Sequence, residues 1–104
     1  MTIARFYILK AAEGKGDALA TALTTLADAT HLAPNSEGVD LLRDAENDNR
    51  FFYFEKWPSI EAHLKAGEWL NTEAAAPVNH ALKLVAAAID HEPESSYIEY
   101  FKIA

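Results

Sequence analysis

Hydrophobic spacing divides the 104-residue chain into strand-like and helix-like stretches. Two runs, Thr2–Lys10 and Arg50–Trp57, are rich in the aromatic and β-branched residues that favour strands. Leu19, Leu23 and Leu26 recur at intervals of four and three, the spacing of an amphipathic helix. The predicted elements are, in order, strand Thr2–Lys10, helix Asp17–His31, strand Val39–Asp44, strand Arg50–Trp57, a helix from Ser59 to Gly67, a helical turn within Glu68–Ala76, helix Pro77–Asp90 and strand Ser96–Ile103.

Turn and capping residues mark the boundaries of these elements. Asp17 and Ser59 are suited to N-caps, Gly67 to the end of a helix, and the polar run Ala45–Asn49 to a hairpin turn. The order β-α-β-β-α-β, with a broken second helical stretch, is the ferredoxin-like α+β plan, in which helices cover one face of a four-stranded sheet. We therefore expect a single domain spanning residues 1–104.

Both faces of the predicted sheet are apolar. In a lone ferredoxin-like domain one sheet face meets water, so its strands should alternate between apolar and polar residues. In strand Arg50–Trp57, however, Phe51 and Tyr53 lie on one face while Phe52 and Phe54 lie on the other. We expect a second copy of the chain to cover the open face in a two-fold homodimer. The alternative is that these aromatic side chains remain on an exposed sheet.

Composition and charge narrow the classes of partner. The formal net charge is −7 and the nine Lys and Arg residues form no dense cluster. Nucleic acid is therefore not an expected partner, because phosphate binding requires a basic surface. No apolar run approaches the roughly 18 residues of a membrane span, and the first residues lack a signal-peptide pattern. Without cysteine, disulfides and thiolate metal sites are excluded. We expect a cytoplasmic protein with no membrane partner.

The chain also lacks the common metal and phosphate motifs. It has no His-x-x-x-His or Glu-x-x-His pair, no calcium-type acidic loop, no glycine-rich phosphate loop and no Gly-x-Ser-x-Gly elbow. We therefore expect neither a metal nor another cofactor. The candidate chemistry lies where strand Arg50–Trp57 meets the next helix, because Tyr53, Glu55, Trp57 and His63 occur there among bulky apolar residues.

The same junction carries a family resemblance. The run Phe52-Tyr53-Phe54-Glu55-Lys56-Trp57, followed by Ser59 and Glu61-Ala62, resembles the aromatic strand and Glu-x-Trp motif of the antibiotic biosynthesis monooxygenases, a family of dimeric α+β barrels that includes small quinol monooxygenases. The helix ending near Thr30, Gly38-Val39 and Arg43-Asp44 also match, so the resemblance extends from about Ile3 to Ile103. It implies a cofactor-independent monooxygenase that oxidises a small aromatic quinol or a polyketide-like phenol.

Two positions depart from the family pattern. The segment Ala33–Gly38 is longer than the usual Glu-Pro-Gly turn, and the histidine common nine residues after the Trp is Ala66 here. In the family's cofactor-independent polyketide oxygenases, polar residues four before and six after the Trp line the pocket. The resemblance therefore implies that Tyr53 and His63 line a pocket beside Trp57. Haem-degrading relatives use an Asn on the first strand, which this chain lacks.

The chemistry of these residues suggests a role and a structural alternative for each. His63, which stands three and four residues from Ile60 and Gly67, is expected to face inward, and its imidazole is suited to taking a phenolic proton. The alternative is a histidine that bonds a backbone carbonyl. Trp57 offers an indole N–H to a ligand, or else fills the core at a strand end. Tyr53 is suited to orienting a hydroxylated ligand. We take His63, Trp57 and Tyr53 as the candidate catalytic residues.

Glu55 shares a strand face with Phe51 and Trp57. A carboxyl group buried among aromatic residues must be paired or protonated, and Arg5 or Arg43 could supply the pair from a neighbouring strand. We take Arg5, Glu55 and Phe51 as candidate substrate-binding residues, with a structural ion pair as the alternative for Glu55.

The fold alone does not decide between functions. The monooxygenase is the first candidate. A non-enzymatic ligand-binding or stress-response barrel with the same pocket is the second, and a dimeric barrel used only for assembly is the third.

Overall fold

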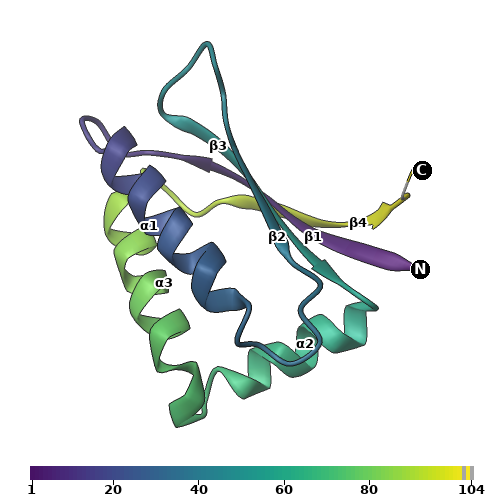
Figure 1. The fold of residues 1–104 in the computed structure, drawn as a ribbon. Coiled ribbons are helices and arrows are strands. Elements are labelled where there is room, and N and C mark those ends of the chain that lie inside the picture. Colours follow the sequence, from purple (N-terminus) through teal and green to yellow (C-terminus); the bar gives the residue numbers. More distant parts are fainter. Residues whose placement is uncertain (102, 104) are drawn as a thin grey trace.

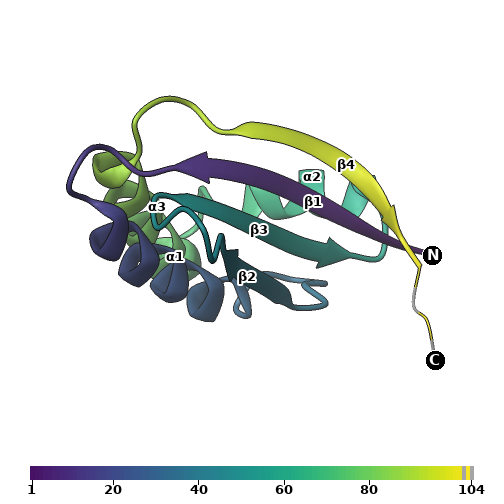
Figure 2. The same ribbon diagram turned by 90° about the horizontal axis from the view of Figure 1, so that it is seen from above.

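In the computed structural model, which describes residues 1–101 and 103, the three α-helices lie on one side of a four-stranded antiparallel sheet (Figure 1). The elements are β1 (Thr2–Lys10), α1 (Gly16–Thr30), β2 (Val39–Arg43), β3 (Arg50–Trp57), α2 (Ile60–Trp69), the 3₁₀ turn η1 (Glu73–Ala75), α3 (Ala76–Ala88) and β4 (Glu94–Tyr100). Figure 2 shows the strand order β2-β3-β1-β4 from above. The predicted ferredoxin-like α+β fold is confirmed.

Several predicted boundaries are correct and others are wrong. Ser59 caps α2, since its hydroxyl oxygen accepts a hydrogen bond from the Ala62 N–H at 3.1 Å. Gly67 does not end that helix, which continues to Trp69 because the chain goes on making helical hydrogen bonds. Asp17 lies in the first turn of α1 and does not cap it.

The last strand is shorter than predicted. It ends at Tyr100, whereas the prediction extended to Ile103 and included Lys102, which lies outside the described residues. Among the described residues, no helix has the length and apolar character that a membrane crossing requires.

Alternate residues of the strands supply the sheet's half of the core. Leu9 of β1 and Phe51 and Tyr53 of β3 point toward the helices. They pack against the buried positions of α1 and α3, which are Leu19, Ala22, Leu23, Leu26, Val78, Ala81, Val85 and Ala88. Leu82 of α3, four residues after the buried Val78, is 39% exposed. Small alanines take the central positions of that face, which allows the two helices to approach closely.

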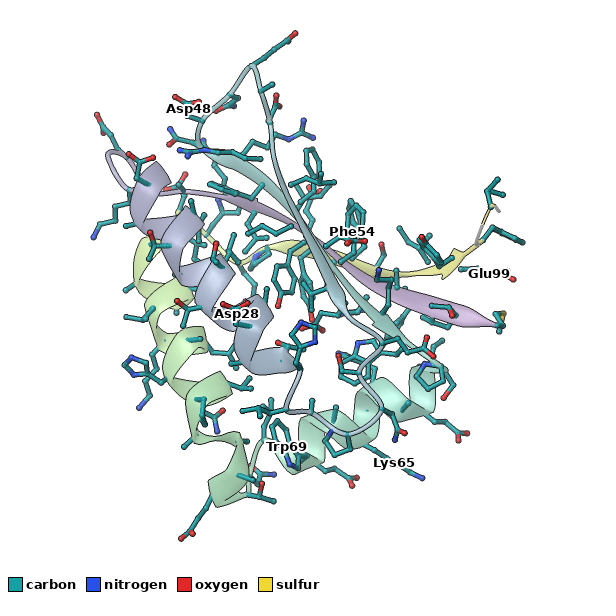
Figure 3. The ribbon with its side chains drawn as sticks, viewed as in Figure 1. Asp28, Asp48, Phe54, Lys65, Trp69 and Glu99 are labelled. Carbon is teal, nitrogen blue, oxygen red and sulfur yellow. The ribbon has the colours of Figure 1, made fainter. Side chains whose placement is uncertain are left out.

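The opposite face of the sheet carries several large apolar side chains and, within the described residues, no helix. Phe6 of β1 and Phe54 of β3 are paired across the strands, with ring centroids 4.8 Å apart. Figure 3 shows Phe54 on the side of the sheet away from the helices. Ile98 and Tyr100 of β4 are 44% and 41% exposed on the same face. The alternation of β3 therefore delivers large apolar side chains to both faces, as the sequence predicted.

Candidate functional site

Strand pairing places three polar residues side by side on the helix-facing side of the sheet. Arg5 of β1 lies opposite Glu55 of β3 on one side and opposite Tyr97 of β4 on the other. The guanidinium carbon of Arg5 lies 4.3 Å from the centre of the Tyr97 ring, and its Nη2 donates a hydrogen bond to Ser95 Oγ at 2.8 Å. The Arg5 side chain of β1 therefore points toward β4 and not toward Glu55 of β3.

A cavity of about 130 Å³ lies between this part of the sheet and the helices. Its walls are mostly apolar, and they include both tryptophans of the chain. Figure 3 shows one of them, Trp69, at the end of α2 nearer α3. The lining residues are Tyr7, Leu26, Thr30, Ala33, Glu55, Trp57, His63, Ala66, Gly67, Trp69, Leu70, Val78 and Leu82.

A second cavity of about 130 Å³ adjoins the first. The two share Tyr7, Leu26, Glu55 and Leu82 as walls, and Tyr53 lines only the second. Glu55 is the one acidic residue in either lining among the described residues. Its carboxyl group therefore stands where the two spaces meet.

The Glu55 carboxyl is buried without a close cation. Its side chain is only 14% exposed, and burial raises its pKa to about 7, although the Trp57 indole and the Arg5 guanidinium act in the opposite direction. The predicted ion pair with Arg5 or Arg43 is not formed among the described residues, because Arg5 turns to β4 and Arg43 pairs with Asp17 at 3.1 Å. Near neutral pH, Glu55 therefore exists in both its protonated and its ionised form.

His63 reaches the site from the first turns of α2. Its Nδ1 lies 2.7 Å from the Tyr97 hydroxyl oxygen, and its Nε2 lies 3.7 Å from Glu55 Oε1. The ring also meets the Trp57 ring edge-on, with centroids 5.5 Å apart. Burial, followed by the Arg5 charge, lowers the His63 pKa, so the neutral imidazole is favoured.

His63 lines the cavity for a different reason from the predicted one. The inward orientation was expected from the spacing of His63 to Ile60 and Gly67, but Ile60 is 41% exposed. The buried residues of α2 are Ala62 and Ala66. His63 lies beside this alanine stripe, and the small side chains bring the helix close enough to the sheet for the imidazole to reach Glu55.

The other predicted site residues divide into two groups. Trp57 lines the first cavity, and its buried Nε1 has no hydrogen-bond partner among the described residues. Tyr53 is buried, its hydroxyl oxygen lies 3.4 Å from Thr30 Oγ1, and burial, reinforced by the Glu55 charge, raises its pKa. Phe51 is 1% exposed within the core and, like Arg5, lines neither cavity.

Sequence reasoning missed the partner of His63. Neither Tyr97 nor Tyr7 was among the candidate site residues. What brings Tyr97 to His63 is the register of β4 on β1, which places Tyr97 opposite Arg5. Hydrophobic alternation predicts the face of a strand residue but not its register, so the sequence carried no signal for this contact.

Within the part of the chain that the structure describes, no three His, Cys, Asp or Glu side chains lie together. His31, His80 and His91 are exposed and line neither of the two cavities beside Glu55.

Comparison with known proteins identifies the fold and the family. The family model described as Antibiotic biosynthesis monooxygenase matches residues 2–76. A Bordetella bronchiseptica protein classed with the antibiotic biosynthesis monooxygenases has a similar structure, with a TM-score of 0.78 and 16% identity over 97% of this chain and 98% of that chain. SnoaB, a cofactor-independent oxygenase from Streptomyces nogalater, has a TM-score of 0.76 and 14% identity over 98% of this chain and 95% of that chain. A Nitrosomonas europaea protein of the same class has a TM-score of 0.78 and 16% identity over 98% of this chain and 100% of that chain.

At these identities the structures show a common fold alone. The chain has no significant match among curated protein sequences.

Proposed function

The chain belongs to the antibiotic biosynthesis monooxygenase family, and we propose that it is a cofactor-independent monooxygenase that oxidises a small aromatic quinol or a polyketide-like phenol with dioxygen. One observation carries the proposal: an acid–base pair, Glu55 and His63, stands in a cavity whose other walls are aromatic and aliphatic. Such a cavity suits a flat hydroxylated ring, because apolar walls bury the ring while few polar groups orient its oxygens.

The proposed reaction begins with loss of a proton from the ligand near His63. The electron-rich carbanion that results attacks dioxygen and forms a carbon–oxygen bond. After a proton returns to the terminal oxygen, the hydroperoxide loses water and leaves a carbonyl group, so one oxygen atom enters the product and the other leaves as water. In this scheme Trp57 and Tyr53 hold the ring and its oxygens. Arg5, which lies next to Glu55 on the neighbouring strand but outside the cavity lining, contributes a fixed positive charge. Phe51 packs in the core and holds strand β3 in place.

A ligand-binding protein without turnover is the second candidate. It is favoured by the engagement of His63, whose two ring nitrogens face Tyr97 and Glu55, so that neither points freely into the cavity.

Oxygen uptake with a panel of quinols and phenols tests the first candidate. We expect consumption above the rate without protein, a loss of about 100-fold or more in His63→Ala if proton transfer is lost, and a smaller loss in Trp57→Phe. If no compound in the panel raises oxygen consumption, the monooxygenase proposal fails. Fluorescence then detects the second candidate, because both tryptophans line the cavity and report a bound ring directly.

We further propose that two copies pair through the open face of the sheet, in the cytoplasm. The exposed apolar side chains of that face, such as Ile98 and Tyr100, would otherwise meet water. Light scattering should give twice the 11.5 kDa mass of one chain. Phe54→Glu should give the single-chain mass, whereas Leu84→Glu, on the exposed side of α3, should leave the mass unchanged. A wild-type mass of one chain at micromolar concentration would refute the dimer.

A further inference from the structure

We propose that Glu55 is the group that takes the ligand's proton at this site, and that His63, positioned by Tyr97, removes the proton from Glu55. The inference rests on the proposed function for its ligand class, a neutral aromatic compound with an ionisable hydroxyl group. It assigns to Glu55 the base role that sequence reasoning gave to His63.

The hydrogen-bond geometry of His63 supports this assignment. If the Tyr97 hydroxyl donates to Nδ1, then Nε2 carries the ring proton and faces Glu55 Oε1 at 3.7 Å. If Nδ1–H donates to Tyr97, then Nε2 presents its lone pair to the same oxygen. Each ring nitrogen thus has one neighbour, Tyr97 for Nδ1 and Glu55 for Nε2. Only the Nδ1–H tautomer can take a proton from Glu55, so the proposal assigns that tautomer to His63.

Glu55 has the position that a proton acceptor requires. It lines both cavities, and its side chain is only 14% exposed. Trp57 lines the first cavity with it. The buried Trp57 Nε1 makes no hydrogen bond of good geometry among the described residues, although the indole lies close enough to Glu55 to lower its pKa. One ligand hydroxyl between them would accept from the indole N–H and donate to the carboxylate. Once the proton has moved, the same N–H would stabilise the negative charge on the ligand oxygen.

Of the groups around the ligand site, Glu55 and His63 are the two that change protonation state in the proposed step. Tyr7 and Tyr53 stay neutral, because burial and the Glu55 charge raise their pKa. Arg5 of β1 is a cation behind the carboxyl, and Tyr97 of β4 lies beyond His63. Among the described residues, these groups and His63 from α2 are the titratable and charged residues near Glu55.

The proposed step conserves protons and electrons. The ligand O–H bond breaks, its proton binds a carboxylate oxygen of Glu55, and the electron pair stays on the ligand oxygen. In the oxygen-free complex the proton rests on Glu55. During turnover it passes from Glu55 Oε1 to His63 Nε2, which restores the carboxylate and leaves an imidazolium whose Nδ1–H donates to Tyr97. The imidazole is 21% exposed, so it can release the proton to water.

The decisive measurement is made without oxygen, using 4-nitrophenol as the probe because its ionisation is visible by absorbance. Tryptophan quenching follows its binding, and infrared difference spectra follow the carboxyl groups. In the wild type we expect binding to produce the band of one protonated carboxyl group. Glu55→Gln should bind the probe and lack that band, while Glu99→Gln, on an exposed position of β4, should keep it.

A second variant separates the role of Tyr97. In Tyr97→Phe the Glu55 band should persist, while ¹⁵N spectra should show both neutral tautomers of His63 in place of the single tautomer expected in the wild type. Unchanged tautomer populations would refute the positioning role of Tyr97.

Oxygen uptake distinguishes this inference from the proposed function. With an active quinol, Glu55→Gln should lower the rate by about 100-fold or more and remove the rise in rate near neutral pH, and Glu55→Asp should recover part of both.

If the band appears without any oxygen uptake, the oxygenase fails and the role of Glu55 stands. If uptake is present but Glu55→Gln keeps the rate and pH profile, or if the bound probe gives no band, the role of Glu55 is overturned. If 4-nitrophenol does not quench the tryptophans in a saturable way, the ligand class and the inference both fail.

Discussion

Replacing Glu55 by Gln should change how the stability of the fold depends on pH. Burial raises the pKa of this carboxyl to about 7, against an ordinary value of 4.5. Between these two values the folded chain binds more protons than the unfolded chain, so the free energy of unfolding falls as the pH rises. The stabilising effect of protonation is complete at pH values below the Glu55 pKa of the unfolded chain. It is lost as the pH rises through the Glu55 pKa of the folded chain.

The size of this effect follows from the shift. Each pKa unit corresponds to about 1.36 kcal/mol, so ionising Glu55 in the folded state costs on the order of 3 kcal/mol. Glu55→Gln keeps the shape of the side chain and removes its charge. At each pH the quantity of interest is the unfolding free energy of Glu55→Gln minus that of the wild type. This difference should rise by about 3 kcal/mol from acid pH to pH values above the folded pKa.

Urea unfolding followed by tryptophan fluorescence measures this difference at each pH. The protein concentration must be held fixed, because a dimer unfolds in a concentration-dependent way. Glu99→Gln is the control, since its carboxyl is exposed and its removal should leave the pH dependence as it is. A difference between Glu55→Gln and wild type that is constant with pH, or that grows toward acid pH, would refute the reasoning about burial.

Three substitutions test the assignments of neighbouring residues. Phe51→Ala should cost about 3–5 kcal/mol in urea unfolding, because the ring is buried in the core; an unchanged unfolding midpoint would contradict the core assignment. Ser59→Ala should cost about 1 kcal/mol by removing the cap of α2, and Ser59→Asp should restore most of it; if Ala is as stable as Asp, the cap is unimportant. Gly67→Ala should raise stability by up to about 1 kcal/mol, because the position is helical and a Cβ there would meet no atom within 4 Å; a lower unfolding temperature would show that glycine is needed there.

Hydrophobic spacing and capping residues were sufficient to predict most of the fold. Strand β3 was predicted with both of its ends, because aromatic residues fill it between a polar turn and Pro58. The start of α2 was predicted because Ser59 acts locally, through a hydrogen bond to the helix it begins. Its end was not predicted, because a lone glycine at a helical position costs only about 1 kcal/mol, which neighbouring contacts outweigh.

The candidate site was harder to predict because its contacts are tertiary. Glu55 was assigned to the correct face of β3, but its expected ion pair required knowing where Arg5 and Arg43 turn. Arg43 is held by Asp17 across the start of α1, and Arg5 stacks on Tyr97. Both arrangements depend on how separate elements dock. The raised pKa of Glu55 follows from its burial between docked elements, which the sequence alone did not predict.

The aromatic strand that carries Glu55 links the two surfaces of the molecule. Phe51, Tyr53, Glu55 and Trp57 face the helices, while Phe52 and Phe54 face away from them, because side chains alternate along a strand. A slip of one residue in the pairing of β3 with β1 would exchange these two sets, placing Glu55 on the open face and phenylalanines in the cavity. The register that places apolar rings on the open face, through which we propose that two copies pair, is therefore the same register that buries the carboxyl beside His63. The proposed assembly and the proposed proton transfer are thus not independent, because one strand in one register specifies the residues on which both depend.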